Sequence, residues 1–242
     1  MSAAAPGGWY LPRMRLPITE YGRRDLLVAT LVCGALAVPP LWFASDLPWL
    51  ALLAAVPIAV WLLLVNFFRD PERRVPQGER LILSPADGRV TDLEEVDEPE
   101  FLGGRALRLG IFLSPLNVHV NRAPMDCRVV QVDYRRGAMH KAYDPRARTE
   151  NEAAALRLEV DGGRARMIGR QVEGGRARRK GCPVQPGARL RAGERYGMIK
   201  LGSRTEVWVR ADQAVVWRVR IGDTVKGGLT LLGELGPPAD RA

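Results

Sequence analysis

The sequence contains few of the residues that build disulfide frameworks or metal centres. Its 242 residues include three cysteines, Cys33, Cys127 and Cys182, which share no spacing typical of metal ligands. Cys33 lies inside a long apolar run, and the spacing indicates no disulfide framework, which agrees with a reducing compartment. Two histidines in the whole chain offer little for a histidine-rich site. We therefore expect no bound metal.

Acidic and basic residues are nearly absent between residues 26 and 68, where Asp46 is the only one. This part holds two apolar runs, each about the length that crosses a bilayer, and their prolines kink such helices without excluding them. The short link "DLP" joins the runs, with Trp42 and Trp49 beside it. The sequence predicts a transmembrane or re-entrant helical hairpin over 26–68, preceded by a basic segment, 1–25. A buried helical pair in a soluble core is the alternative.

Basic residues flank both open ends of this hairpin. They are Arg13, Arg15, Arg23 and Arg24 before it, and Arg69, Arg73 and Arg74 after it. The positive-inside rule then predicts the cytoplasmic (inner) membrane, with the rest of the chain on the cytoplasmic side. A cleaved signal peptide fits poorly, because the first apolar run starts late, is long and is followed at once by another.

The net charge of +9 indicates an acidic partner. Part of it is concentrated in residues 161–181. The basic side chains there are Arg164, Arg166, Arg170, Arg176, Arg178, Arg179 and Lys180. Beside a membrane hairpin, this segment favours an anionic membrane surface over nucleic acid, at roughly 1 kcal/mol per basic side chain near the headgroups. A merely solvated basic loop is the other interpretation.

After the connector "RDPERRVPQGE", the chain from 69 to 242 reads as mainly β. Short alternating or β-branched runs are broken by Gly, Pro, Asp and Asn about every ten residues, and no long amphipathic helical period competes with them. We expect a soluble β domain of barrel or sandwich-hybrid type over 69–242.

The stretch "YGMIKLGSRTEV" places Gly202 and Ser203 at the one break in what reads as a β-hairpin. A turn is the simplest explanation, because a serine becomes a nucleophile only when a base can take its proton. The candidate bases are His119, in a strand-like segment, and His140, in a loop-like one. Asp87 precedes a glycine, and Asp-Gly pairs usually form turns. Each of these residues alone has a structural explanation.

One alternative is a carrier or binding module rather than an enzyme. The phrase "IGDTVKGGLTLLGEL" (221–235) resembles the folded-over strands of lipoyl and biotinyl carrier domains, in which Lys200 would be the modified lysine. Lys200 stands next to an apolar stretch, however, and a carrier has no need of a membrane hairpin. A lipid-binding β domain without catalytic activity is a further alternative.

Five motifs taken in order resemble the short, membrane-attached phosphatidylserine decarboxylases over nearly the whole chain. They are "FFRDPERRVP", "LSPADGRV", "FLSPLNVHVNRAP", the pair Asn151-Glu152 and "KLGSRTEV". Two positions depart from the family pattern. Arg204 follows the Gly-Ser pair where many relatives have Thr or Ser, and Arg122 stands where longer relatives have a second histidine.

The resemblance implies that the Gly202–Ser203 bond is a self-cleavage site. In that family the serine hydroxyl attacks the preceding glycine carbonyl, and the resulting ester eliminates to give a pyruvoyl group, here derived from Ser203. A large chain, 1–202, would stay associated with a small chain, 203–242. Orientation of the two reacting groups in a tight turn removes roughly 7 to 11 kcal/mol of such a barrier. No metal is required.

The resemblance also implies the roles of the other candidate residues. His119 would be the base for Ser203 and later an acid, and Asp87 would orient it and stabilise its imidazolium form. The pyruvoyl group would form a Schiff base with phosphatidylserine, giving phosphatidylethanolamine and carbon dioxide. Arg122 and His140 are candidate substrate contacts. The sequence leaves a homodimer open.

Overall fold

The computed structural model of the chain describes residues 17–138, 140, 144, 146–160, 163, 165–173, 182–200, 203–213 and 215–236. For Ser203 the backbone is described and the side chain is not. Gly202 lies outside the described residues, as do Arg13, Arg15 and much of the basic segment 161–181.

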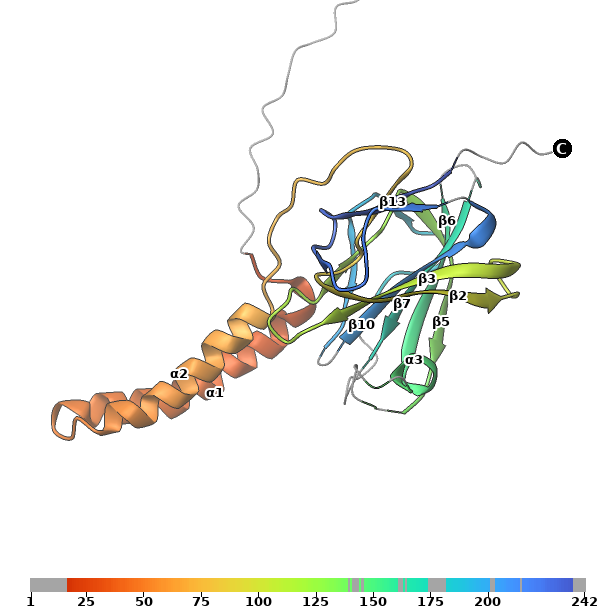
Figure 1. The fold of residues 1–242 in the computed structure, drawn as a ribbon. Coiled ribbons are helices and arrows are strands. Elements are labelled where there is room, and N and C mark those ends of the chain that lie inside the picture. The colour runs from red at the N-terminus through yellow and green to blue at the C-terminus, as the bar shows by residue number, and fades with distance from the viewer. Residues whose placement is uncertain are drawn as a thin grey trace, which may run out of the picture.

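Two helices, α1 (Arg23–Trp42) and α2 (Leu50–Phe67), form a hairpin that projects from the rest of the molecule (Figure 1). The short 3-10 helices η1 (Glu20–Gly22) and η2 (Phe43–Ser45) precede and follow α1. The 20 residues of α1 rise about 30 Å at 1.5 Å per residue, which matches the hydrocarbon thickness of a bilayer. Both helices are long and apolar enough to cross a membrane by length and composition.

The exposed surface of the hairpin is unlike that of a helical pair in the core of a soluble protein. Small buried side chains, Ala37 and Ala54, lie where the helices meet, and the Trp61 indole donates a 2.9 Å hydrogen bond to the Thr30 hydroxyl across the pair. Large apolar side chains point away from the contact, including Leu52, which is 74% exposed, and Trp42, which is 77% exposed. The buried-pair alternative is therefore wrong for this structure.

The remaining described residues form strands and two short helices. The strands are β1 (Leu81–Leu83), β2 (Gly88–Glu98), β3 (Gly104–Leu113), β4 (Val120–Arg122), β5 (Cys127–Arg135), β6 (Ala153–Val160), β7 (Ala165–Val172), β8 (Arg189–Leu190), β9 (Arg195–Met198), β10 (Ser203–Arg210), β11 (Val216–Trp217), β12 (Thr224–Val225) and β13 (Leu231–Glu234). The helices are α3 (Ala147–Glu150) and the 3-10 helix η4 (Ala211–Gln213).

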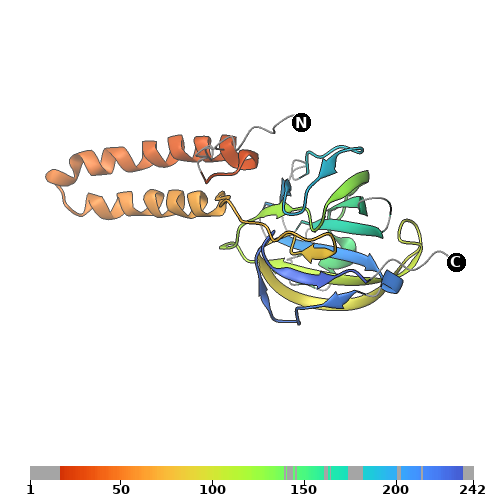
Figure 2. The same cartoon turned by 90° about the horizontal axis from the view of Figure 1, so that it is seen from above.

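Eight of these strands make one large antiparallel sheet in the order β12-β2-β3-β10-β7-β6-β5-β8. The sheet curls into a half-barrel, and two smaller sheets, β1-β13-β11 and β4-β9, lie against it (Figure 2). This confirms the expected mainly β domain with an N-terminal helical hairpin. The strand β10 lies near the middle of the sheet, between β3 and β7.

The core lies between the inner face of the large sheet and the two small sheets. Alternate residues of the central strands enter it, such as Val207 and Val209 of β10 and Leu109 and Ile111 of β3, all completely buried. Tyr196 of β9 joins the same cluster from the small sheet. The core therefore fixes β9 and β4 over the central strands.

The base of the hairpin is fastened to the β domain. The Thr19 amide donates to the Phe68 carbonyl at 2.9 Å, and the Asp70 amide donates to the Pro17 carbonyl at 2.7 Å. Phe67 and Phe68 pack with Met198, at the end of β9, in a separate apolar cluster. The end of α2 is thus held against the segment that leads into Ser203.

The strands on either side of Gly202–Ser203 do not form a hairpin, and that expectation is wrong. Strand β9 pairs with β4 in the two-stranded sheet, whereas β10 pairs with β3 and β7 in the large one. Local alternation around a Gly-Ser break cannot reveal this, because each strand takes its partner from a distant part of the chain. The link between Met198 and Ser203 therefore connects two different sheets.

Candidate active site

Ser203 is the first residue of β10, where its backbone pairs with Leu113, at the end of β3. The chain continues from Leu113 through a loop to His119. On the other side, the Ile199 amide donates a 3.2 Å hydrogen bond to the His119 carbonyl. The segments that lead to Ser203 are therefore paired with the segments that lead to His119.

The loop before His119 is braced by its own side chains. The Asn117 carboxamide oxygen accepts hydrogen bonds of 2.8 Å from both the amide and the hydroxyl of Ser114. The Asn117 carbonyl oxygen then lies 2.9 Å from Nδ1 of His119. A carbonyl oxygen only accepts, so Nδ1 carries the imidazole proton and Nε2 carries the free electron pair.

The His119 imidazole is completely buried, and its ring centroid lies 4.3 Å from that of Phe67. Burial lowers its pKa to about 4, against the raising effects of the Asn117 carbonyl and the Asp87 charge, while Arg69 lowers it further. Nε2 has no hydrogen-bond partner among the described residues. His119 thus presents a neutral nitrogen base.

Asp87 lies at the entry to β2, and its carboxylate is held from two directions. Arg73 donates two hydrogen bonds to it, at 2.5 and 2.8 Å, and the Gly227 amide donates a third at 2.8 Å. We expected Asp87 to orient His119, but in the described contacts the Asn117 carbonyl performs that role. Asp87 acts on His119 through its charge, which raises the histidine pKa.

A buried polar chain connects β4 to the large sheet next to these residues. The Asn121 side chain donates to the Thr205 hydroxyl at 3.1 Å and accepts a 2.6 Å hydrogen bond from the Gln171 side chain. All three residues are at most 2% exposed. These hydrogen bonds fix the register between β4, β10 and β7. Asn121 lies two residues from His119, and Thr205 lies two residues from Ser203.

Arg122 is buried with internal partners. It donates to Asp70 at 2.8 Å and to the Gly193 and Pro71 carbonyls at 3.1 Å, while its Nε has no partner among the described residues. It also lines a pocket of about 330 Å³. The other lining residues are Glu72, Arg73, Val75, Arg191, Ala192, Gly193, Glu194 and Arg195. Four arginines make this pocket suitable for an anion.

His140 lies outside that pocket. Its Nε2 is 2.7 Å from a carboxylate oxygen of Glu150, and its backbone is clasped by the Asn151 side chain. The same Asn151 carboxamide donates to the Glu173 carbonyl at 2.7 Å. The Asn-Glu motif thus fastens the His140 segment to the end of β7, near the start of β10.

Arg204, directly after Ser203, belongs to a buried ionic network. Its guanidinium donates to Asp92 at 2.6 Å, to Glu206 at 2.7 Å and to the Thr91 hydroxyl at 2.8 Å. Burial alone would raise the pKa of Asp92, but the hydrogen bond from Arg204 holds it below the usual value. A side chain at Gly110 would run into the paired groups of Arg204 and Asp92. The network anchors β10 immediately after the predicted cleavage point.

Two residues of the basic segment 161–181 are strand residues with internal partners. Arg166 stacks on the Phe101 ring, and Arg170 donates to Glu206 at 3.2 Å. The interpretation of this segment as a loop is therefore wrong for these two residues, and its contact with a membrane surface stays a prediction. Arg164, Arg176, Arg178, Arg179 and Lys180 lie outside the described residues.

Comparison with known proteins places this geometry in a family. A family model described as phosphatidylserine decarboxylase matches residues 61–233. A phosphatidylserine decarboxylase proenzyme of Rhodopirellula baltica is 42% identical over 93% of this chain and 91% of its own length. The chain belongs to the phosphatidylserine decarboxylase family. Proenzymes of the same name are 45% identical in Symbiobacterium thermophilum, over 76% of this chain and 84% of the relative, and 39% identical in Chlorobium luteolum, over 90% and 99%.

Membership of the phosphatidylserine decarboxylase family confirms the resemblance read from the motifs and makes the carrier alternative wrong. The structure agrees for Lys200, the proposed carrier lysine. Its ammonium group pairs with Asp25 in the first turn of α1 instead of standing free at a hairpin tip. Lys200 thus joins the segment before Ser203 to the helical hairpin.

Several residues of this decarboxylase site were not predicted from the sequence. Arg73 was read only as a basic flank, although it lies in the motif "FFRDPERRVP", and Phe67 was read only as part of an apolar run. Glu173 was not singled out within the basic segment 161–181. Its burial and register, which sequence patterns do not report, are what single it out.

Proposed function

We propose that this chain cleaves itself between Gly202 and Ser203 and then decarboxylates phosphatidylserine to phosphatidylethanolamine. The observation that carries the proposal is the buried, unpartnered Nε2 of His119 beside the strand that leads into Ser203. A buried base without a partner is costly unless it serves a reacting group. The proenzyme names of the relatives support the processing step.

In the processing step, Nε2 of His119 takes the proton of the Ser203 hydroxyl as its oxygen attacks the Gly202 carbonyl carbon. The Asn117 carbonyl holds the imidazole in the tautomer that this transfer needs. As the imidazole gains charge, the nearby Asp87 carboxylate stabilises it. Breaking the Gly202–Ser203 amide bond leaves an ester. Elimination from this ester frees Gly202 as a carboxylate and leaves a dehydroalanine, and its hydrolysis releases ammonia and gives the pyruvoyl group.

The site suits a pyruvoyl group at residue 203, because the backbone there is fixed by pairing on β3 and the segment just before it, at Ile199, is hydrogen-bonded to His119, whose Nε2 has no partner among the described residues. When present, this group supplies a carbonyl that forms a Schiff base with the substrate amine and withdraws electrons as the carboxylate leaves. His119 would supply one neutral base to this site, and Asp87, whose charge acts on His119, one fixed negative charge. No metal is part of the proposal.

The two chains made by cleavage would remain one folded unit. The small chain, 203–242, contributes β10, which is hydrogen-bonded on both sides to strands of the large chain, 1–202. It also contributes the Gly227 amide that binds Asp87 and the Gly228 amide that donates to the Ser84 carbonyl at 2.7 Å. The contacts that hold the site would therefore survive the cut.

The hairpin of α1 and α2 would lie in the cytoplasmic membrane and hold the β domain on the cytoplasmic side. Its outer surface is apolar, and basic residues, including Arg23, Arg24 and Arg69, gather where it meets the β domain. A lipid substrate in the same membrane would then reach the site at high effective concentration.

The substrate phosphodiester would bind basic groups near the hairpin base. The pocket lined by Arg122, Arg191 and Arg195 begins three residues from His119 along β4 and offers guanidinium groups for a phosphate. His140 would contact the substrate from the other side, through the segment that Asn151 fastens to β7.

Intact mass of the purified protein tests the processing step. We expect two chains, 1–202 and a pyruvoyl-ended 203–242, and one uncleaved chain from Ser203→Ala. Ser45→Ala, at the far tip of the hairpin, serves as the matched control and should cleave normally. A single unmodified chain from active wild-type protein would sink the proposal.

Substrate class is tested with the cleaved protein in mixed detergent micelles. Phosphatidylserine should release carbon dioxide and yield phosphatidylethanolamine, whereas free serine at the same concentration should not react. Equal turnover of both compounds would contradict a lipid substrate.

A further inference from the structure

Glu173 follows the last residue of β7 and stands one register step from Ser203. Val172 pairs with Arg204 of β10 on one side and with Ala153 of β6 on the other. The next step of the same ladder brings Glu173 level with Ser203 and with Glu152. The Glu173 amide donates to the Glu152 carbonyl at 2.9 Å, which continues the ladder on the β6 side.

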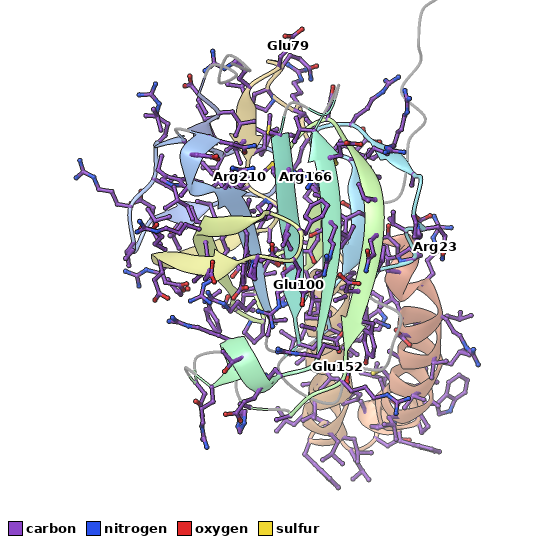
Figure 3. The ribbon with its side chains drawn as sticks, turned by 90° about the vertical axis from the view of Figure 1, so that its right-hand side faces the viewer. Arg23, Glu79, Glu100, Glu152, Arg166 and Arg210 are labelled. Carbon is purple, nitrogen blue, oxygen red and sulfur yellow. The ribbon has the colours of Figure 1, made fainter. Side chains whose placement is uncertain are left out.

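The ends of these strands are visible in Figure 3, where Glu152 lies at the lower end of the sheet, and Arg166 and Arg210 lie toward the upper end. This arrangement agrees with the register. Arg166 pairs with Glu159, near the end of the β6–β7 ladder that lies away from Glu152. Arg210 ends β10, at the opposite end of that strand from Ser203. Glu173 thus belongs to the end of the sheet at which the small chain begins.

Side-chain alternation places Glu173 on the face that His119 occupies. Gln171, two residues earlier in β7, directs its side chain to Asn121 of β4. Residues two apart on a strand share a face, so Glu173 is on the same face as Gln171. Asn121 in turn is two residues from His119. Glu173 and His119 therefore lie on the same side of the sheet, near the start of β10.

Glu173 is half-buried, and one of its carboxyl oxygens lacks a hydrogen bond. Its Oε2 has no hydrogen-bond partner among the described residues. Burial raises its pKa to about 7, and the nearby Glu152 charge adds to the rise. Glu173 therefore holds a proton in a substantial fraction of molecules at neutral pH.

His119 is poorly suited to be the proton donor of the same site. Its Nδ1 proton is engaged by the Asn117 carbonyl, and with a pKa of about 4 its Nε2 is unprotonated at neutral pH. The net reaction nevertheless consumes one proton, because the C–C bond to the carboxylate breaks and a C–H bond forms in its place. The resemblance implied His119 as this donor, but a group that is protonated at neutral pH is better suited to deliver that proton.

We propose that Glu173 is the proton donor that completes decarboxylation, while His119 is the base of self-cleavage. The inference rests on the proposed function. The pair of electrons left on the substrate α-carbon when carbon dioxide departs takes the proton of the Glu173 carboxyl group, which becomes a carboxylate. Bulk water returns a proton to it before the next turnover.

The groups around Glu173 set the direction of the pH dependence. Glu152 from the β6 side is the charged neighbour that shifts its pKa among the described residues. Ser203 is its neighbour in register on β10, and His119, the residue before β4, is the titratable side chain on the same side of the sheet. Donation needs the protonated form, so turnover should fall as pH rises through about 7. Removing the Glu152 charge should move that fall to lower pH.

The main test compares Glu173→Gln with Glu79→Gln, an exposed carboxylate at the opposite end of the β domain, in the full cleaved protein. We expect normal cleavage in both variants, and a loss of about 100-fold or more in kcat only for Glu173→Gln, which is the range for a general acid. In a first turnover, labelled carbon dioxide should appear at near the wild-type rate while phosphatidylethanolamine lags. Simultaneous appearance at wild-type rates would overturn the proposal.

A second measurement needs no turnover. In the uncleaved Ser203→Ala protein, infrared spectra should show a protonated carboxyl band at about pH 6 that disappears by about pH 8.5. The band should be missing in Ser203→Ala/Glu173→Gln and should titrate at lower pH in Ser203→Ala/Glu152→Gln. A protonated carboxyl band that remains after the loss of Glu173 would contradict its assignment to Glu173. This outcome counts against the proposal even if the Glu173→Gln variant itself misfolds.

Failure of this inference is distinguishable from failure of the proposed function. If the wild-type protein does not cleave at Gly202–Ser203 or does not act on phosphatidylserine, the proposed function is wrong. If both occur and Glu173→Gln retains wild-type turnover and pH dependence, the proposed function stands and Glu173 is not the donor.

Discussion

The ring of Phe67, the last residue of α2, packs 4.3 Å from the imidazole of His119 at an angle of 36°. The end of an apolar helix thus forms one wall around the proposed base. This contact removes water from the imidazole, and the loss of water is the main reason for its low pKa. The helical hairpin therefore contributes to the site directly as well as through membrane attachment.

Phe67→Ala should raise the pKa of His119 from about 4 toward its ordinary value of 6.5, because water would reach the ring. NMR titration of the imidazole protons measures this shift in the uncleaved Ser203→Ala protein. The chain has two histidines, so adding His140→Gln leaves a single signal to follow. Phe43→Ala, on the exposed tip of the hairpin, is the control. An unchanged His119 pKa in Phe67→Ala would show that the ring does not shield it.

His119 should also make the folded state sensitive to acid. Its folded pKa of about 4 is below the unfolded value of 6.5, so the unfolded chain binds more protons between these values. This contribution to stability is fully present above pH 6.5 and is lost as pH falls through 4. The loss between pH 7 and pH 4 is about 3 kcal/mol, at 1.36 kcal/mol per pKa unit.

Urea unfolding of Ser203→Ala in detergent, with and without His119→Gln, measures this loss. Replacing the imidazole should be less destabilising at pH 4 than at pH 7 by about the same 3 kcal/mol. The comparison between variants is needed because Glu173, whose pKa is raised to about 7, changes stability in the opposite direction over part of this range. A pH-independent difference between the two proteins would rule out the buried neutral imidazole.

Arg204→Met should destabilise the fold by about 3–5 kcal/mol, because it leaves the buried carboxylates of Asp92 and Glu206 without their shared partner. Arg210→Met is the matched control on the same strand, since the Arg210–Asp212 pair is exposed and should contribute less than about 1 kcal/mol. Urea midpoints of the two variants in the Ser203→Ala background provide the measurement. Equal midpoints would contradict the importance of the network.

The large and small chains should elute together from a sizing column after cleavage, at the volume of the uncleaved Ser203→Ala protein. Strand β10 remains paired with β3 and β7, and Gly227 still binds Asp87. Denaturing gels of the eluted peak give the composition. Separation of the two chains without denaturant would mean that these contacts do not hold the cleaved protein.

The fold class and the hairpin were predictable because they depend on local patterns. Uncharged runs, alternating apolar residues and closely spaced turn residues report directly on helices and strands. The same patterns misled the interpretation of the Gly202–Ser203 break. Strands β9 and β10 are adjacent in sequence, but their partners are β4, β3 and β7, and long-range pairing leaves no local signal.

The candidate site was predictable as far as its motifs extend. His119 and Asp87 lie in recognisable sequence motifs. The structure places the segment around His119 beside the segment that leads to Ser203. The partners of these residues were not predictable. Arg73 reaches Asp87 across 14 positions and Gly227 reaches it across 140, so only the folded chain reveals that the carboxylate is already engaged.

The hydrogen bond from the Gly227 amide to Asp87 has a consequence for the order of events during synthesis. Gly227 lies 24 residues after Ser203, so a ribosome has already made both residues of the proposed cleavage site before Asp87 acquires this partner. Under the proposed function, truncated or half-folded copies would lack the arrangement that promotes cleavage. The cofactor would then arise only in chains that extend past Gly227 and have folded, and the cut itself would serve as a check on the quality of the product.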